Sequence, residues 1–261
     1  MAATFKLLGT GAGPGVPSFY CNCIACQEAR ENPRFSRTRS GAILDLGEKK
    51  ILIDASPDLR HQLLREKIDE LSCIFLTHWH YDHFGGLGEV EFYVRLVRHE
   101  PLTLYLPPSA VEEYRAAFPH LQDVLVPEPW QFGRSYDFGR ATLTPLPANH
   151  SIETAGILVV GKKSLAYFTD TCGLPAETLQ RVQGVDILIC DATFHGENWY
   201  PHSHMSVEQA IALGRATGAG KTILTHLAMH YSQAVTVRQL EQEIASYPGV
   251  SLAFDGLELE L

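Results

Sequence analysis

Residues Thr77-His78-Trp79-His80-Tyr81-Asp82-His83 place four potential metal-binding side chains within six positions, directly after a mostly apolar run at 71–76. Because side chains alternate along an extended chain, His78 and His80 can point the same way. Imidazole and carboxylate groups together suit Zn²⁺, Mn²⁺ or Fe²⁺. The motif predicts a metal centre at the end of a strand, and an acidic surface turn that carries histidines is the alternative.

One such cluster cannot fill two coordination spheres, so further ligands should follow other strands. His150, Asp170 and His226 each come directly after, or close behind, an apolar run. Each alone could be a structural histidine or a capping aspartate. Ligands in open α/β sheets gather at the carboxyl ends of strands, and this repeated position makes all three candidate ligands.

Hydrophobic patterning along the chain predicts strands that alternate with helices, and therefore an α/β fold with helices packed outside the sheets. We expect one domain over residues 1–261, with an irregular segment at 195–204 that could lie over the site. The predicted strands are 4–8, 41–46, 50–54, 71–77, 102–106, 141–146, 156–160, 165–169, 186–190, 222–225 and 252–254. The predicted helices are 57–67, 87–97, 110–118, 176–182, 206–216 and 237–246, and the metal motif at 78–83 is predicted as a loop.

Net charge and the length of the apolar runs limit which classes of partner we expect. The 261 residues carry a formal net charge of −9, which disfavours a large nucleic acid or an anionic membrane as partner but allows a small phosphorylated molecule held at metal ions. No apolar run approaches the roughly 20 residues that span a bilayer, and the first residues lack a secretory pattern. We therefore expect a cytoplasmic protein without a membrane partner, which could form a homodimer.

Glycines and cysteines crowd the N-terminal region. Gly9, Gly11, Gly13 and Gly15 indicate tight turns with close backbone approach; Pro14 and Pro17 stand where a dinucleotide-binding loop would need a helix. Cys21, Cys23 and Cys26 follow, and in a reducing compartment such a cluster indicates metal binding more than disulfides. An incidental or reactive group is the alternative. Cys73 and Cys190 are expected in the core, and Cys172, near Asp170, is expected to line the site.

The ordered motifs resemble the metallo-β-lactamase superfamily. They are Thr77 to His83, Asn149-His150-Ser151, Phe168-Thr169-Asp170 and Leu224-Thr225-His226. The resemblance implies a four-layer αββα sandwich. It also implies that His78, His80 and His150 hold one metal and that Asp82, His83 and His226 hold the other, with Asp170 bridging both.

The cysteine motif resembles one branch of that superfamily, the phosphoribosyl cyclic phosphate phosphodiesterases of phosphonate metabolism. It is also similar to the superfamily protein of pyrroloquinoline quinone biosynthesis. The first resemblance implies a structural Zn²⁺ in an N-terminal loop, held by Cys21, Cys23, Cys26 and His230. His204 lies where related phosphodiesterases and tRNA-processing nucleases carry a catalytic histidine; the alternative is that it only opens the following helix.

These observations predict a two-metal phosphodiesterase that hydrolyses small cyclic phosphodiesters, either phosphoribosyl 1,2-cyclic phosphate or a nucleoside cyclic phosphate. A hydroxide shared by two Mn²⁺ or Zn²⁺ ions would attack phosphorus. Asp82 and His204 are the expected catalytic residues, with His204 protonating the leaving oxygen. A thioester or lactone hydrolase and a metal-dependent protein of quinone biosynthesis remain the alternatives, and the complete second-metal set favours catalysis over binding alone.

Overall fold

The computed structural model describes residues 3–261, which form two seven-stranded sheets. The first sheet, from one edge to the other, contains β14 (Glu258–Glu260), β1 (Thr4–Gly9), β2 (Gly41–Asp45), β3 (Lys50–Ile53), β4 (Cys73–Phe75), β5 (Leu102–Leu106) and β6 (Leu125–Pro129). The second contains β13 (Val250–Leu252), β12 (Lys221–Thr225), β11 (Ile187–Asp191), β10 (Ser164–Phe168), β9 (Ala155–Val160), β8 (Thr142–Pro147) and β7 (Tyr136–Asp137).

Each sheet is half parallel and half antiparallel. Strands β3 to β6 run parallel in the first sheet, and β10 to β13 run parallel in the second. The other neighbours pair antiparallel. The carboxyl ends of the parallel strands are the expected positions for a ligand site.

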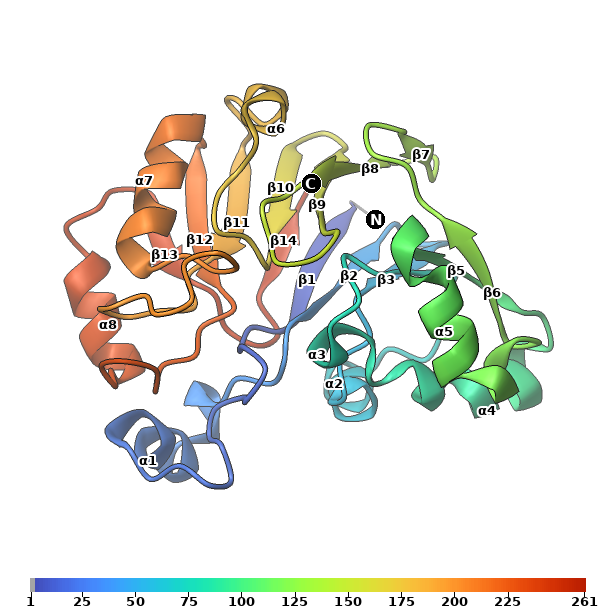
Figure 1. Ribbon diagram of the computed structural model, residues 1–261, viewed down its shortest axis with the longest axis horizontal. Helices are drawn as coiled ribbons and strands as arrows, with labels where there is room; N and C mark the ends of the chain where they lie inside the picture. Colours follow the sequence, from blue (N-terminus) through green and yellow to red (C-terminus); the bar gives the residue numbers. More distant parts are fainter. Residues whose placement is uncertain (1–2) are drawn as a thin grey trace.

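Helices cover the outer faces of both sheets (Figure 1). The α-helices are α1 (Ile24–Glu31), α2 (Leu59–Glu66), α3 (Tyr81–Phe84), α4 (Glu91–Tyr93), α5 (Val111–Ala117), α6 (Ala176–Arg181), α7 (Val207–Thr217) and α8 (Val237–Ile244). Short 3₁₀ turns lie at Pro33–Phe35, Leu87–Val90, Pro108–Ala110 and Pro119–Leu121, and Val94–Arg98 is a π-helical turn. Helices α2, α4 and α5 lie on one side of the molecule and α7 and α8 on the other.

The two sheets and the helices outside them make four layers, and three apolar clusters fill the spaces between consecutive layers. One lies between the sheets and combines Phe5 and Phe75 of the first sheet with Ile157, Tyr167 and Ile189 of the second. The other two lie between each sheet and its own helices. Every layer therefore buries apolar surface against the next, which is the main stabilising contribution in a fold of this size. The αββα architecture expected from the sequence is confirmed.

Helix α7 shows how local sequence fixes an element. Ser206 and Gln209 form a reciprocal capping box at its start, and Gly218 adopts a left-handed conformation at its end. Gly214 faces the sheet so closely that a Cβ there would lie 2.2 Å from Thr222 Oγ1. A larger residue at Gly214 would push the helix off the strand.

Several elements differ from the sequence prediction. The predicted helix at 87–97 is instead a 3₁₀ turn, one turn of α-helix and a π-helical turn, so the segment is helical throughout but not a regular α-helix. Helix α1 begins inside the cysteine motif, and α3 inside the metal motif, where loops were predicted. Strands β6, β7 and β14 were not predicted; β6 contains two prolines and β14 alternates charged residues with one leucine, so neither has a typical strand pattern.

Candidate metal centre

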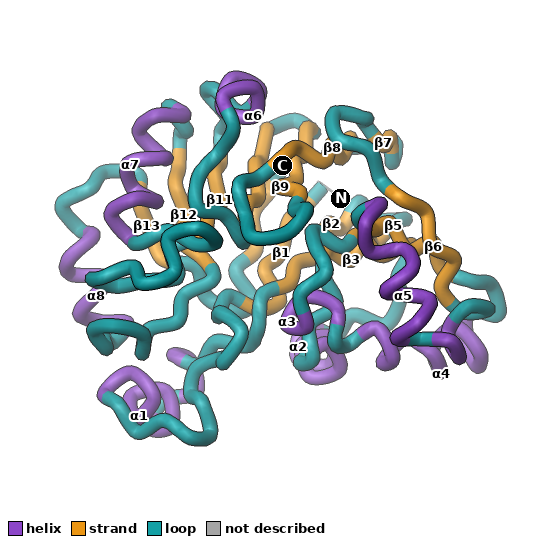
Figure 2. The backbone as a smooth tube through the Cα atoms, in the orientation of Figure 1, coloured by secondary structure: helices purple, strands orange, loops and turns teal. Residues whose placement is uncertain are grey.

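The predicted active-site ligands follow strands at one edge of the sandwich. Most of them lie in loops, whereas Asp82 and His83 lie in the short helix α3, which Figure 2 labels. The motif at 78–83 follows β4 in the first sheet. His150, Asp170 and His226 follow β8, β10 and β12 in the second. Residues from both sheets therefore meet, although they are far apart in the sequence.

The first group of ligands is His78, His80 and His150. His78 Nε2 lies 2.9 Å from His80 Nδ1, which lies 3.2 Å from His150 Nε2. Burial lowers the pKa of all three histidines, and the pKa of His78 falls furthest. Neutral imidazoles keep a lone pair on one nitrogen, which is the form that binds metal ions.

The second group is Asp82, His83 and His226, whose ligand atoms lie within 4.8 Å of one another. Asp82 Oδ2 lies 3.6 Å from His83 Nε2 and 3.7 Å from His226 Nε2. Burial opposes ionisation of Asp82, but His83 and His226 hold its pKa well below the ordinary value. This carboxylate is therefore charged at neutral pH and available to a cation.

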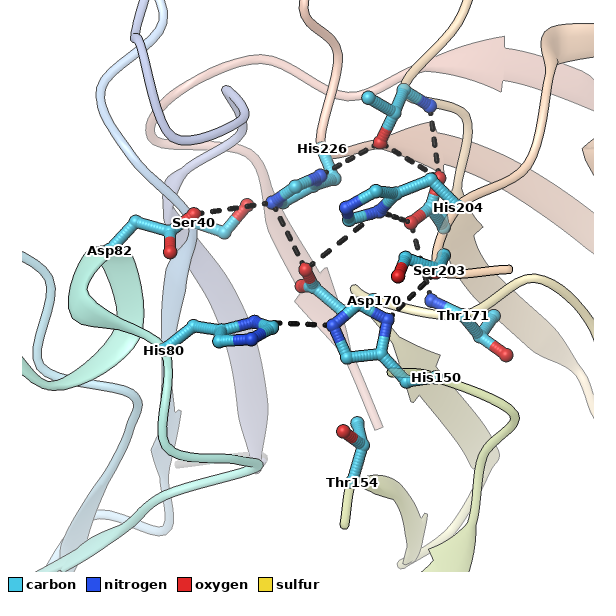
Figure 3. A network of polar contacts seen from close by, with 12 residues as sticks. Ser40, His80, Asp82, His150, Thr154, Asp170, Thr171, Ser203, His204 and His226 are labelled. Carbon is cyan, nitrogen blue, oxygen red and sulfur yellow. Dashed lines mark hydrogen bonds and ion pairs between the residues drawn. The ribbon is translucent and has the colours of Figure 1, made fainter. Parts of the chain in front are cut away.

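Asp170 lies between the two groups (Figure 3). Its Oδ2 is 3.1 Å from His83 Nε2, and its Oδ1 is 3.3 Å from His226 Nε2 and 3.8 Å from His78 Nε2. Burial opposes ionisation of Asp170 as well, but the surrounding histidines keep its pKa well below the usual range. The position matches the bridging role that the resemblance implied.

The residues fit two metal ions. His83 Nε2, His226 Nε2 and Asp170 Oδ2 are buried without a hydrogen-bond partner, which is costly for polar atoms unless a cation binds them. They converge on the same space as the remaining ligands. Two groups of inward-facing nitrogen and oxygen atoms that share one carboxylate are what a pair of Zn²⁺ or Mn²⁺ ions would require.

The outward nitrogen atoms of the histidines are fixed by hydrogen bonds. His83 Nδ1–H donates to Asp54 Oδ2 at 2.8 Å, and His150 Nδ1–H donates to the carbonyl of Ser203 at 2.8 Å. Such bonds leave the lone pair on Nε2 and orient each ring toward the metal.

Two threonines extend the same arrangement. Thr77 Oγ1 lies within 2.9 Å of both Asp54 Oδ2 and His78 Nδ1, and its hydroxyl donates to the carboxylate and accepts from the imidazole. Thr193 Oγ1 likewise lies 2.9 Å from Asp191 Oδ1 and 2.8 Å from His226 Nδ1. His78 and His226 therefore also present Nε2 to the interior.

His204 faces Asp170 from the loop between β11 and α7. Its ring stacks 5.1 Å from that of His226, and its Nδ1–H donates to Asp191 Oδ2 at 2.7 Å. Burial lowers the pKa of His204, but the carboxylates of Asp191, Asp170 and Asp82 raise it to about 9. An imidazole held by a buried carboxylate can be positioned as an acid.

The profile of the β-lactamase superfamily domain matches residues 49–227, which include all seven of these predicted ligands. The chain belongs to the β-lactamase superfamily. Together with the two sheets and the ligand order, the match confirms the metallo-β-lactamase fold.

Superfamily members of several functions are similar to this chain. An octanoyltransferase of Porphyromonas gingivalis is 30% identical over 97% of this chain, but the chain spans only 50% of that protein. A coenzyme PQQ synthesis protein B of Methylobacterium is 27% identical, covering 98% of this chain and 99% of the relative. Ribonuclease Z of Methanosarcina mazei is 26% identical, covering 88% and 94%.

Solved structures of proteins with different functions also share this fold. A diphosphatase from the PhnP family superposes with a TM-score of 0.87 at 27% identity, covering 99% of this chain and 98% of that one. Zn²⁺-bound PqqB from Methylobacterium extorquens has a TM-score of 0.79 at 22% identity, covering 99% and 100%. The superfamily fold is thus the shared feature, whereas the activities of these relatives differ.

A cavity of about 260 Å³ opens beside the ligands of this superfamily centre. Its lining includes His80, Asp82, Asp170, His204 and His226. Gly13 lies so close that a Cβ there would be 3.2 Å from Asp82 Oδ2, so the glycine-rich loop does approach by its backbone, as the sequence predicted.

The cysteine motif forms a separate group beside His230. Ligand atoms of Cys21, Cys26 and His230 lie within 4.8 Å of one another, and Cys26 Sγ is 3.6 Å from His230 Nδ1. Cys23 lies outside this group, although its backbone N–H and its thiol are close enough to lower the pKa of the Cys21 thiol. Two thiols and an imidazole suit Zn²⁺, and Cys23 as the fourth ligand stays a prediction.

The two cysteines expected in the core lie there. Cys73 and Cys190 are buried in β4 and β11, and burial raises the pKa of the Cys73 thiol to about 12. Cys172 is partly exposed but is not among the residues that line the cavity, so its expected place in the lining is not confirmed. In residues 3–261, no helix is long and apolar enough to cross a bilayer.

Sequence reasoning missed Asp54, Asp191 and Thr193, which position the ligands. The first two had the same signal as Asp170, because each ends or follows an apolar strand. Asp191 is fully buried and accepts hydrogen bonds from His204, Thr193 and the backbone of Met205. Applying the strand-end rule to every aspartate would have found both.

Proposed function

We propose that this chain hydrolyses small phosphodiesters, with cyclic phosphodiesters as the preferred class. The observation that carries the proposal is that two ligand groups bridged by Asp170 share one cavity with His204. That combination supplies separate positions for the phosphoryl oxygens, the attacking water and the leaving oxygen. The substrate could be phosphoribosyl 1,2-cyclic phosphate, which would place the chain in phosphonate metabolism, or a nucleoside cyclic phosphate.

When bound, two divalent metals would lower the pKa of water toward about 7 and neutralise charge on the phosphoryl oxygens. The ligands His78, His80 and His150 would hold one metal, Asp82, His83 and His226 the other. Asp170 contacts both groups and keeps them at a fixed separation. A hydroxide would add to phosphorus as the bond to one ester oxygen breaks.

His204 would supply the proton that the leaving oxygen needs. Its Nδ1 is bound to Asp191, so only Nε2 remains to act on the substrate, and the side chain lines the cavity. The carboxylates raise its pKa to about 9, against the effect of burial, and nearby metal cations would bring it down toward neutrality. The proton ends on the leaving oxygen, and the product is a phosphomonoester.

A diphosphate is the second candidate substrate, because the PhnP-family structure at 27% identity is that of a diphosphatase. The same residues could act on a phosphoanhydride, where the leaving group is a phosphate and needs less protonation. A long RNA is disfavoured by the net charge of −9 and the small cavity. Thioester or lactone hydrolysis and a role in quinone biosynthesis are the alternatives, because metal-activated water can also attack a carbonyl carbon and a PQQ synthesis protein B is 27% identical over 98% of this chain.

The test is a substrate panel with metal-quantified protein. It contains a ribosyl cyclic phosphate, a nucleoside 2′,3′-cyclic phosphate, a nucleoside diphosphate, a thioester and a lactone. The proposal predicts the highest kcat/KM for a cyclic phosphodiester. Faster turnover of the diphosphate would favour the second candidate, and turnover of only the carbonyl substrates would overturn both.

A further inference from the structure

One wall of the active-site cavity is aromatic. Phe194, Trp199, Tyr200 and Tyr231 line it together with the metal ligands. The ring of Trp199 lies 5.0 Å from Phe194, edge to face, and 5.3 Å from Tyr231. Phe194 is buried, whereas Trp199 is 56% exposed. A large ring supported by two others and open on its remaining surface is a platform for a flat partner.

The loop that carries this wall is held in place. Asn198 Nδ2 donates to the His204 carbonyl at 2.7 Å, and Asn198 Oδ1 accepts from the Tyr200 backbone at 3.0 Å. The backbone N–H of His204 also donates to the Tyr200 carbonyl. The aromatic platform and the proposed acid therefore belong to one short, internally bonded segment. A substrate that reaches His204 from the cavity lies beside Trp199.

The charges of the cavity lining restrict which part of a substrate can bind against the aromatic wall. Among the described residues that line the cavity there is no lysine or arginine. Arg39, which bonds to the Gly13 carbonyl nearby, is paired with Asp58. A second phosphate on the substrate, away from the metals, would thus have no cationic side chain in the cavity to bind it, whereas a neutral planar ring would have the aromatic wall.

From these observations we infer that the substrate carries a nucleobase that stacks on Trp199, which makes Trp199 the residue that determines specificity. The inference rests on the proposed function and narrows it to nucleoside cyclic phosphates, in preference to a ribosyl cyclic phosphate with a further phosphate. Base–aromatic stacking tolerates every base because each has a π-face. Preference among bases should therefore be small.

The experiment compares two substrates with the same cyclic diester and sugar. Adenosine 2′,3′-cyclic phosphate has the base, and methyl β-riboside 2,3-cyclic phosphate has a methoxy group in its place. The wild type should show a kcat/KM about ten to a hundred times higher for the first. Trp199→Ala should reduce that ratio to nearly one, mainly through KM, and Trp199→Phe should restore most of it. Phe92→Ala removes an exposed aromatic outside the cavity and should leave the ratio at its wild-type value.

Equal kcat/KM for the two substrates in the wild type, or the same proportional loss on both in Trp199→Ala, would overturn the inference. If neither diester is turned over, the proposed function fails. The stacking of a base on Trp199 is then tested separately, by measuring the binding of a nucleotide through tryptophan fluorescence. Of the three tryptophans, Trp130 is buried, Trp79 is partly buried and Trp199 is exposed. Because Trp79 and Trp130 are present in both proteins, adenosine monophosphate should quench fluorescence in the wild type but much less in Trp199→Phe. If adenosine monophosphate quenched the wild-type fluorescence no more than ribose 5-phosphate does, the inference that a base stacks on Trp199 would be overturned.

Discussion

Four histidines of the metal centre, His78, His83, His150 and His226, are each fixed by an outward hydrogen bond, so ligands and the residues that position them have separable roles. Asp170 contacts both ligand groups, and His80 belongs to one. Asp170→Asn should lose both metals and nearly all turnover, and His80→Ala should lose about one metal. Metal analysis with kcat on the preferred diester measures both.

The control for these variants is Asp69→Asn, which changes an exposed aspartate outside the site. It should keep the metal content and rate of the wild type. An Asp170→Asn protein that retains both metals and more than a tenth of the rate would contradict the bridging role.

His204 is expected to act on the leaving group and not on metal binding. His204→Ala should keep both metals and slow hydrolysis of a diester with a poor leaving group by about 10²–10⁴-fold. A nitrophenyl diester, whose leaving group departs without a proton, should be much less affected. The wild-type kcat on the poor leaving group should also fall as pH rises through the pKa of His204, because the acid is then lost, and the variant should lack that limb.

His202 provides the matched control, since it is an exposed histidine in the same loop. His202→Ala should have wild-type rates on both substrates. Equal losses on good and poor leaving groups in His204→Ala would point to a positional effect and remove it as the acid.

Asp54 is a positioning residue that acts through His83. Its carboxylate accepts from His83 Nδ1 and from Thr77 N, each at 2.8 Å. An amide in its place can accept only on one side, so Asp54→Asn should weaken metal binding or activity about 10–100-fold. Excess metal in the assay should restore much of the rate, a response that a general folding defect would not show.

At the scale of elements, the cysteine group links the N-terminal loop and α1 to the segment between β12 and α8. Val237 N, at the start of α8, also donates to Glu28 Oε2 of α1 at 2.8 Å. A Zn²⁺ held there would join regions about 200 positions apart, since Cys26 and His230 differ by 204. Cys26→Ser should therefore lose about one zinc per chain and lower Tm.

Cys172→Ser is the comparison for that variant, because it removes a partly exposed thiol outside the group. It should keep all the zinc. His226 comes four positions before His230, so the Cys26→Ser protein should also bind the second active-site metal more weakly. Full zinc content and unchanged Tm in Cys26→Ser would show that the cysteines hold no structural metal.

At the scale of the whole molecule, the metal centre connects the two sheets. Four of the predicted ligands follow β4 in the first sheet, and the other three follow β8, β10 and β12 in the second. Metal removal leaves buried, unpartnered atoms at the junction. A ligand at 100 times its Kd stabilises by about 2.7 kcal/mol, so chelation should lower Tm by roughly 5–10 °C. Differential scanning calorimetry with metal added back measures this, and an unchanged Tm would contradict metal binding at the junction.

The sequence by itself determined the features that depend on short spacing. The His78 to His83 motif, the strands before His150, Asp170 and His226, and the α/β alternation are all local patterns, because strand and helix periodicity repeat within a few residues. They were enough to predict an α/β fold and the candidate ligands, whereas the αββα arrangement and the division of the ligands between two metals were implied by the resemblance to the superfamily. The shorter strands β7 and β14 have too few residues to show a period, and so escaped prediction.

Only the tertiary structure decided which side chains support those ligands. Asp54 and His83 are 29 positions apart, and Asp191 and His204 are 13 apart, yet each pair forms a hydrogen bond. The tertiary structure also placed Trp199 in the same cavity as the ligands and brought His230 to Cys21 and Cys26. Contacts between distant residues depend on how whole layers pack, because apolar burial is non-directional and leaves no local pattern in the sequence.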